Sequence, residues 1–278
     1  MANYRITVLE IAQKTVGGDF YFGDFVPAEQ EFPNPFSMTL LQGEGGETIL
    51  IDSGVDVSDP VKQGITKAAG MRNVHGPAEV LGTVGVKCED VGAVLLTHAH
   101  FDHAGGIDCF PNAKFYIQRA ELEGWKMAAA NPKYAGLHIF CMDLADIDRL
   151  EALERAGRLE LLDGDAEPFP GIRLINVGQG HSFGSQMVLA DTALGRFLHT
   201  GDACNRPENL TGTETFPFYL PNTKFGVGAV VDVLRGYDKI LELAGGDLKK
   251  LIMTHDDSRR ANFPNRESAL GLTIFNIA

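Results

Sequence analysis

Three histidines and one aspartate fall within six residues of this sequence, namely His98, His100, Asp102 and His103. They follow the apolar stretch 91–96, which predicts a buried strand, and they precede Gly105-Gly106, which allows a tight backbone turn. Imidazole and carboxylate groups together bind zinc and its neighbours in the first transition row. A solvated polar turn is the simpler alternative, but so many histidines after a buried strand are rare by chance. We therefore expect a metal site, whose spacing fits neither a helical HExxH motif nor a zinc finger.

The pattern His-x-His-x-Asp-His after an apolar strand resembles the metal-binding signature of the metallo-β-lactamase superfamily. The resemblance implies an α+β fold, an αββα four-layer sandwich of two mixed β-sheets flanked by helices. It also implies a lone histidine, an aspartate and a final histidine further along the chain, each after a strand. The sequence fills these places in that order with His181, Asp202 and His255. The resemblance spans residues 36–256.

By this resemblance, the seven side chains hold two divalent metal ions, with zinc expected and iron or manganese as alternatives. One ion is assigned His98, His100 and His181. The other is assigned Asp102, His103 and His255, and Asp202 bridges the two. In the turn Ile51-Asp52-Ser53-Gly54, the resemblance implies that Asp52 orients a ligand histidine. The alternative is that Asp52 binds only the local backbone amides of a strand-end turn. Both can be true.

The ligand set also distinguishes members of the superfamily. Oxygen-reducing diiron members usually carry a glutamate in place of His100, and antibiotic-hydrolysing members lack the bridging aspartate. The stretch 32–54 and the overall length look most like the N-acyl-homoserine lactone lactonase group. The implied function is a hydrolase that opens a lactone or a related carboxylic ester by attack of a metal-bridging hydroxide. Asp102 is the expected catalytic residue, passing a proton from the attacking water to the leaving oxygen.

Other functions remain open. A thioesterase of the glyoxalase II type or a phosphodiesterase could use the same two metals. A purely structural metal site is a third option, although such a site leaves no coordination position for water or substrate.

Several residues are candidates for a substrate pocket. The glycine- and proline-rich segment 17–35 is predicted to be a loop, and its first part, 17–25, carries four aromatic rings. These rings either cover a pocket or tuck into the protein body. The related lactonases usually place a tyrosine three residues after the bridging aspartate, where this sequence has an asparagine. This difference leaves the acyl-homoserine substrate open. The pocket candidates are Phe20, Tyr21, Phe22, Asn205 and Tyr219.

Composition and charge limit the remaining possibilities. The 278 residues, 44% of them hydrophobic, are predicted to form a single domain, 1–278, with two internally similar halves at about 1–165 and 166–278. The net charge of −13 disfavours nucleic-acid binding. The expected partner is a small-molecule lactone or ester substrate, as the resemblance implies. The sequence has neither a run of ~18 apolar residues for a membrane helix nor a recognisable secretion signal. Four scattered cysteines indicate reduced thiols and a cytoplasmic protein. A homodimer is one option for its assembly.

Hydrophobic patterning predicts the elements that would position the site. Strands are expected at 4–16, 36–41, 48–51, 91–96, 114–118, 159–162, 172–177, 187–190, 196–200 and 249–253. Helices are expected at 58–69, 121–130, 143–156 and 225–244. Residues 74–86 are expected to be irregular.

Overall fold

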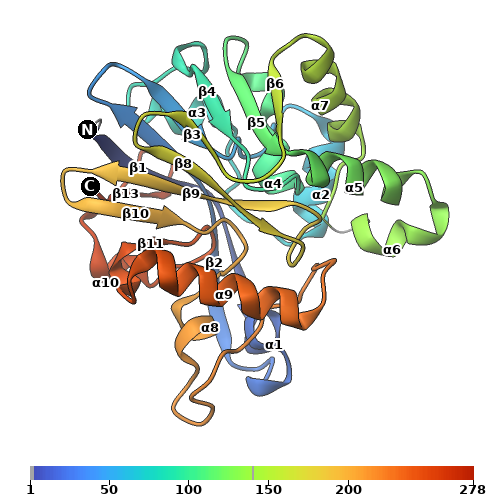
Figure 1. Cartoon of the computed structure of the whole chain (residues 1–278), viewed down its shortest axis with the longest axis vertical. Helices are drawn as coiled ribbons and strands as arrows, with labels where there is room; N and C mark the ends of the chain where they lie inside the picture. Colours follow the sequence, from blue (N-terminus) through green and yellow to red (C-terminus); the bar gives the residue numbers. More distant parts are fainter. Residues whose placement is uncertain (1–2, 140) are drawn as a thin grey trace.

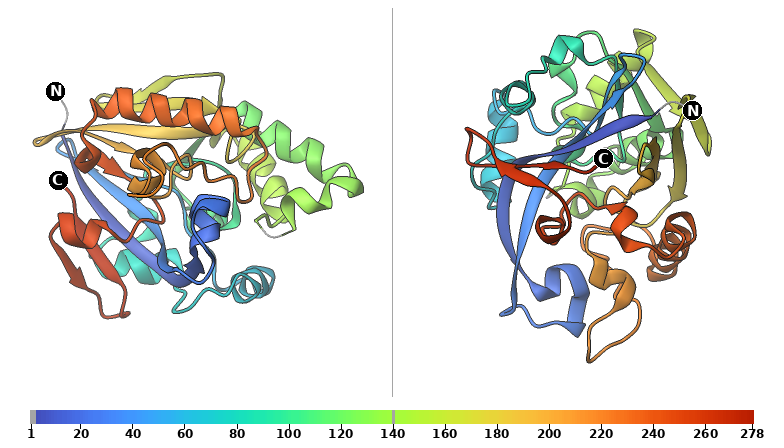
Figure 2. Two further views of the ribbon diagram at one scale, coloured as in Figure 1. Left: turned by 90° about the horizontal axis from the view of Figure 1, so that it is seen from below. Right: turned by 90° about the vertical axis from the view of Figure 1, so that its left-hand side faces the viewer.

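The computed structural model describes residues 3–139 and 141–278. Two mixed β-sheets face each other, and helices cover their outer faces (Figures 1 and 2). This arrangement confirms the predicted αββα sandwich. None of the helices in the described part of the chain is both long and apolar enough to cross a membrane.

The first sheet has eight strands in the order β12-β13-β1-β2-β3-β4-β5-β6. Their bounds are Tyr4–Gly17 (β1), Glu31–Gly43 (β2), Thr48–Ile51 (β3), Ala93–Leu95 (β4), Lys114–Gln118 (β5), Leu159–Leu162 (β6), Asn265–Glu267 (β12) and Thr273–Asn276 (β13). The second sheet has the order β11-β10-β9-β8-β7. Its strands are Ala166–Phe169 (β7), Ile172–Gly178 (β8), Ser185–Thr192 (β9), Gly195–His199 (β10) and Leu251–Ile252 (β11).

The α-helices connect these strands and pack on the sandwich. They are Gly18–Phe22 (α1), Pro60–Ala68 (α2), Pro77–Gly82 (α3), Phe101–Ala104 (α4), Arg119–Ala129 (α5), Ala135–His138 (α6), Ala145–Arg155 (α7), Pro207–Thr211 (α8), Val230–Ala244 (α9) and Arg259–Asn262 (α10). Figure 2 shows α9 lying along the outside of the second sheet, where Tyr237 packs against Met187 and Leu198.

Strand residues alternate between two separate cores. In β3, Leu50 packs outward with the helices around Trp125, while Ile49 and Ile51 pack inward against the second sheet. Successive side chains of a strand point to opposite faces, so a strand covered on both faces is apolar throughout. This explains why the sequence shows continuous apolar runs at these strands.

The long first hairpin differs from the predicted loop at 17–35. This segment forms α1, a short 3-10 turn at Gly23–Phe25 and the start of β2. Pro33 and Pro35 lie inside β2 and pair with Thr15 and Gln13 of β1. Prolines are tolerated there because β3 pairs with β2 only from Thr39 onward, so this end of β2 is an edge that needs no donor on that side.

The structure corrects three further element predictions. Residues 74–86 contain α3, whose first residue is Pro77, where the missing N–H costs nothing. The last long helix begins at Val230, five residues later than the predicted start at 225. Strands β7, β12 and β13 were not predicted.

The chain changes sheet between β6 and β7, near residue 165, but β13 returns to pair with β1 of the first sheet.

Candidate metal centre and substrate pocket

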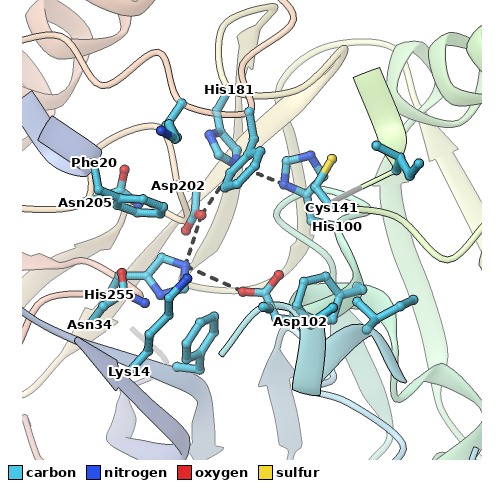
Figure 3. Close-up of a pocket in the computed structure, with 18 of the residues that line it drawn as sticks. Lys14, Phe20, Asn34, His100, Asp102, Cys141, His181, Asp202, Asn205 and His255 are labelled. Atoms are coloured by element: carbon cyan, nitrogen blue, oxygen red, sulfur yellow. Dashed lines mark hydrogen bonds and ion pairs between the residues drawn. The ribbon is translucent and has the colours of Figure 1, made fainter. Parts of the chain in front are cut away.

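The predicted ligands lie in loops and in the short helix α4 at one end of the sandwich. Strands β3 and β4 run parallel with Ile51 beside Leu95, so the segments that follow them emerge together. His181 follows β8, Asp202 follows β10 and His255 follows β11. Figure 3 shows these side chains converging on one space between the sheets.

One glycine is required for this convergence. Gly201, which precedes the predicted bridging aspartate, has a φ of 53°, in the left-handed region. A Cβ atom at this position would lie 2.7 Å from Cβ of Thr97. Glycine therefore lets the β10 loop approach the histidine-rich segment closely.

The structure brings all seven predicted ligands together. Three groups of side chains place their ligand atoms within 4.8 Å of one another. These groups are His98, His100 and His181; His98, His103 and Asp202; and Asp102, His103 and His255. The first and third groups match the sets assigned to the two metals, and Asp202 lies between them.

The distances show how closely Asp202 connects the two sets. Its Oδ2 atom lies 3.1 Å from Nε2 of His255 and 3.4 Å from Nε2 of His181, and its Oδ1 atom lies 3.6 Å from Nε2 of His103. Nε2 of His255 also lies 3.6 Å from Oδ2 of Asp102. One carboxylate thus faces histidines of both sets, as a bridging ligand would.

The hydrogen bonding fits a metal centre. Five buried polar atoms of these side chains have no hydrogen-bond partner among the described residues: Nε2 of His98, His100 and His103, Nδ1 of His181 and Oδ1 of Asp202. Buried polar atoms without partners are costly and uncommon. Neutral imidazole nitrogens and a carboxylate oxygen are the donors that divalent transition metals prefer, so these residues fit such ions.

The protonation states of three histidines agree with this interpretation. Burial lowers the pKa of His98, His100 and His181 below the ordinary histidine value, which keeps these imidazoles neutral and able to bind a metal.

Burial acts to lower the pKa of His103 and His255 as well, but attraction to Asp102 and Asp202 outweighs it and raises that pKa, so a metal would displace a proton from these two. Burial acts to raise the pKa of Asp202, but the attraction of His255 and His103 outweighs it, so this carboxyl is ionised.

Asp52 lies behind the centre and contacts both a ligand candidate and the backbone. Its Oδ2 atom accepts a hydrogen bond from Nδ1 of His103 at 2.7 Å, and its Oδ1 atom accepts one from the N–H of Thr97 at 2.7 Å. The first contact leaves Nε2 of His103 directed at the centre. The contact with His103 is the orienting interaction implied by the resemblance, whereas the backbone contact is to Thr97, in the distant segment after β4, and not to the local amides of the turn.

The comparison with protein families agrees with this geometry. The family model described as the metallo-beta-lactamase superfamily matches residues 33–255. The chain belongs to this superfamily.

Similar proteins of known name include lactonases. An N-acyl homoserine lactonase of Bacillus cereus is 32% identical over 180 residues, which cover 62% of this chain and 64% of that enzyme. The N-acyl homoserine lactonase AiiA of Bacillus thuringiensis subsp. kurstaki is 28% identical over 66% of this chain and 69% of its own. A solved structure of an N-acyl homoserine lactone hydrolase, with N-hexanoyl-L-homoserine at its metal centre, has a TM-score of 0.71 and 21% identity over 95% of this chain and 98% of its own. This last likeness concerns the fold.

In this metallo-β-lactamase superfamily member, a carboxylate not predicted from the sequence joins the segment after β4 to the segment after β8, both of which carry ligand candidates. Glu121 on α5 is fully buried and accepts hydrogen bonds from the N–H groups of Ala99 (2.8 Å) and Gly184 (2.7 Å). It also accepts from Nε1 of Trp125 (2.8 Å) and Oγ of Ser182 (2.6 Å). Ala99 lies between two predicted ligands, and Ser182 directly follows a third. In the sequence, Glu121 looks like an ordinary first-turn acid of a helix.

We expect Glu121→Gln to destabilise the fold by about 3 kcal/mol, because the amide replaces one acceptor oxygen with an NH₂ group that faces buried donors. Denaturant unfolding of the metal-free protein measures this loss. The control is Glu123→Gln on the same helix, where the carboxylate is exposed and pairs with Lys126, and it should change stability by less than about 1 kcal/mol. Equal effects of both variants would contradict the role given to Glu121.

A cavity of about 410 Å³ opens onto the metal centre. Among the residues that line it are His100, Asp102, His181, Asp202 and His255. The volume is typical of sites for small ligands. Potential metal ligands thus form part of the wall of a substrate-sized pocket.

Two aromatic pocket candidates do not line this cavity. Phe20 does line it, whereas Tyr21 and Phe22 are fully buried beneath the loop in a small apolar cluster. The hydroxyl of Tyr21 donates to Oδ1 of Asn34 at 2.6 Å and lies 3.2 Å from the carbonyl oxygen of His255. Tyr21 therefore supports the loop of His255 from behind. Because the three consecutive residues lie in the short helix α1, their side chains point in different directions, which the sequence could not show.

Of the two remaining pocket candidates, Asn205 lines the cavity and Tyr219 does not. The hydroxyl of Tyr219 donates to Asp238 on α9 at 2.9 Å, on the outside of the protein. Oδ1 of Asn205 accepts a hydrogen bond from Nδ2 of Asn222 at 2.7 Å. This bond leaves the NH₂ group of Asn205 available to the cavity.

Proposed function

We propose that this protein is a dinuclear-metal hydrolase that opens a lactone or cleaves a related carboxylic ester. The observation that carries the proposal is the pocket wall, where three candidate ligand histidines and two carboxylates line a cavity large enough for a substrate. The named lactonase relatives support the choice of a lactone. We also propose a cytoplasmic location, which the four free cysteines support.

Two divalent ions, held by the seven side chains with Asp202 between them, would supply a water of lowered pKa and positive charge near the carbonyl and leaving oxygens. Zinc is the first choice on the basis of the histidine-rich set.

The chain's own residues would position the substrate and move a proton. Water oxygen adds to the carbonyl carbon, the ring C–O bond breaks, and the products are a carboxylate and an alcohol with release of one proton. Burial acts to raise the pKa of Asp102, but attraction to His103 and His255 outweighs it and lowers that pKa. Asp102 is therefore ionised at neutral pH and able to accept the proton of the attacking water. The NH₂ group of Asn205 can donate to the substrate carbonyl.

The test is metal analysis combined with a substrate screen. The metal-loaded protein is offered lactones, thioesters and a chromogenic bis-aryl phosphate under the same conditions. We expect the lactones to be the best substrates by kcat/KM. Preference for a thioester or the phosphodiester would assign the protein to those activities, and metal binding without any turnover would indicate a structural site.

We expect close to two metal equivalents per chain after full reconstitution. His255→Ala should retain about one equivalent, because the set of His98, His100 and His181 remains complete. Elemental analysis after removal of excess metal gives the count. The control is His75→Ala, since this histidine lies away from the centre and bonds Glu79 and Asn73. One equivalent in the unmodified protein, unchanged by His255→Ala, would rule out a dinuclear centre.

A further inference from the structure

Two lysines line the same cavity as the metal centre. Apart from the predicted ligands, the charged side chains among the described residues of its lining are Lys14 and Lys224. The protein as a whole carries a net charge of −13. The two lysines therefore offset the charges of Asp102 and Asp202 in the same lining, whereas the protein as a whole is negatively charged.

Neither lysine has a carboxylate within salt-bridge distance in the described part of the chain. The contrast is Lys62, a fully buried lysine whose Nζ lies 2.7 Å from Asp146 and 3.5 Å from Asp143. Burial lowers the pKa of Lys14, and repulsion from Lys224 lowers it further. Two like charges near one another are unfavourable unless something negative lies between them.

The fold brings the two lysines to one rim of the pocket from distant parts of the sequence. Lys14 lies on β1 opposite Asn34 of β2, and its side chain points into the cavity (Figure 3). Its Nζ lies 5.7 Å from the ring centre of Phe20, and that ring lies 6.0 Å from the ring of Phe225. Lys224 directly precedes Phe225 in the sequence and lines the same cavity.

The loop that carries Lys224 is held in a defined conformation. The N–H of Lys224 donates to Oδ1 of Asn222 at 2.9 Å, and Nδ2 of Asn222 donates to Asn205. Phe225 has a φ of 59°, which is strained for a residue with a side chain. Strained backbone of this kind tends to occur at ligand sites. This loop thus links the rim to the residue expected to contact the substrate carbonyl.

We propose that Lys14 and Lys224 form a subsite for a carboxylate on the substrate, so that the preferred lactone or ester carries an anionic group away from the bond that is cleaved. This inference rests on the proposed function. Helix α2 contributes apolar residues to the cavity, including Val61, Ile65 and Ala68. The part of the substrate between the ring and the carboxylate should therefore be compact and apolar.

The test compares matched substrates that differ only in charge. N-acyl homoserine lactones whose acyl chain ends in a carboxylate, from succinyl to suberoyl, are assayed beside their methyl esters. We expect the unmodified protein to prefer at least one acid over its ester. Lys14→Gln and Lys224→Gln should each reduce the ratio of kcat/KM for acid over ester about tenfold, the usual scale of one charged hydrogen bond. The loss should appear mainly in KM, because the carboxylate lies away from the reacting carbonyl.

Further variants keep the test independent of folding defects. Lys224 is exposed, so Lys224→Glu should fold normally and should reverse the preference in favour of the ester. Lys14→Arg should retain the preference. The control is Lys67→Gln on α2, an exposed lysine beside the pocket but outside its lining, which should leave the ratio unchanged. An unchanged ratio in the Lys14→Gln, Lys224→Gln double variant, or a preference of the unmodified protein for every ester, would overturn the subsite.

Failure of the subsite can be separated from failure of the proposed function. Lactone turnover with unchanged ratios in the variants would refute the subsite alone. If no lactone is turned over, the proposed function fails, and calorimetry with the ring-opened acids and their methyl esters still tests the subsite. In that case weaker binding of the acid by Lys224→Glu supports the subsite, and unchanged binding refutes it.

Discussion

Asp202→Ala is expected to abolish turnover and to weaken metal binding at both positions. The carboxylate lies within 3.6 Å of histidine nitrogens from both ligand sets, and its negative charge would offset two cations. The loss of metal affinity should exceed the ~10–100-fold loss that follows removal of a residue that only orients a ligand. Elemental analysis and lactone kinetics at saturating zinc measure the two effects.

The matched control for this change is Asp191→Ala. Asp191 belongs to β9 of the same sheet and forms a surface ion pair with Arg196, which is worth little. The control should keep both the metals and the activity. An Asp202→Ala protein that held two metals tightly and turned over normally would show that Asp202 is not the bridge.

Asp102→Asn is expected to slow turnover by roughly 10²–10⁴-fold, the range of general acid–base catalysis. The amide cannot accept the proton of the attacking water or return it to the leaving oxygen. Metal binding by His98, His100 and His181 should persist, because these side chains form a separate group. The decrease should therefore appear mainly in kcat.

A series of leaving groups distinguishes proton transfer from metal binding. The slowing should be greatest for lactones and alkyl esters, whose alkoxide leaving groups need a proton. It should be smallest for activated aryl esters, whose leaving groups need none. Equal slowing across the series would mean that Asp102 acts only as a ligand, and the proton-transfer role would be withdrawn.

The tertiary structure decided which way the aromatic and polar candidates point. Phe20, Tyr21 and Phe22 are consecutive, yet only Phe20 lines the pocket, because α1 turns the other two rings into the protein. The role of Glu121 depends on four donors from three segments, and none of these contacts is local apart from the one to Trp125. The presence of Lys14 and Lys224 in one cavity likewise depends on the packing of two segments that lie far apart in the sequence.

The sequence by itself determined the strands that precede the ligand candidates and the polar residues that follow those strands, although β7, β12 and β13 were not predicted. An apolar run followed at once by histidine or aspartate is a local pattern, and the ends of packed strands necessarily lie at the edges of a sheet. The histidine-rich segment and the order of His181, Asp202 and His255 after such runs carry the resemblance to the metallo-β-lactamase superfamily, and that resemblance implied the fold and the ligand cluster. What only the tertiary structure decided was the surroundings of that cluster. Side-chain direction in loops is set by contacts between segments far apart in the sequence. Such contacts cannot be deduced from a local sequence pattern.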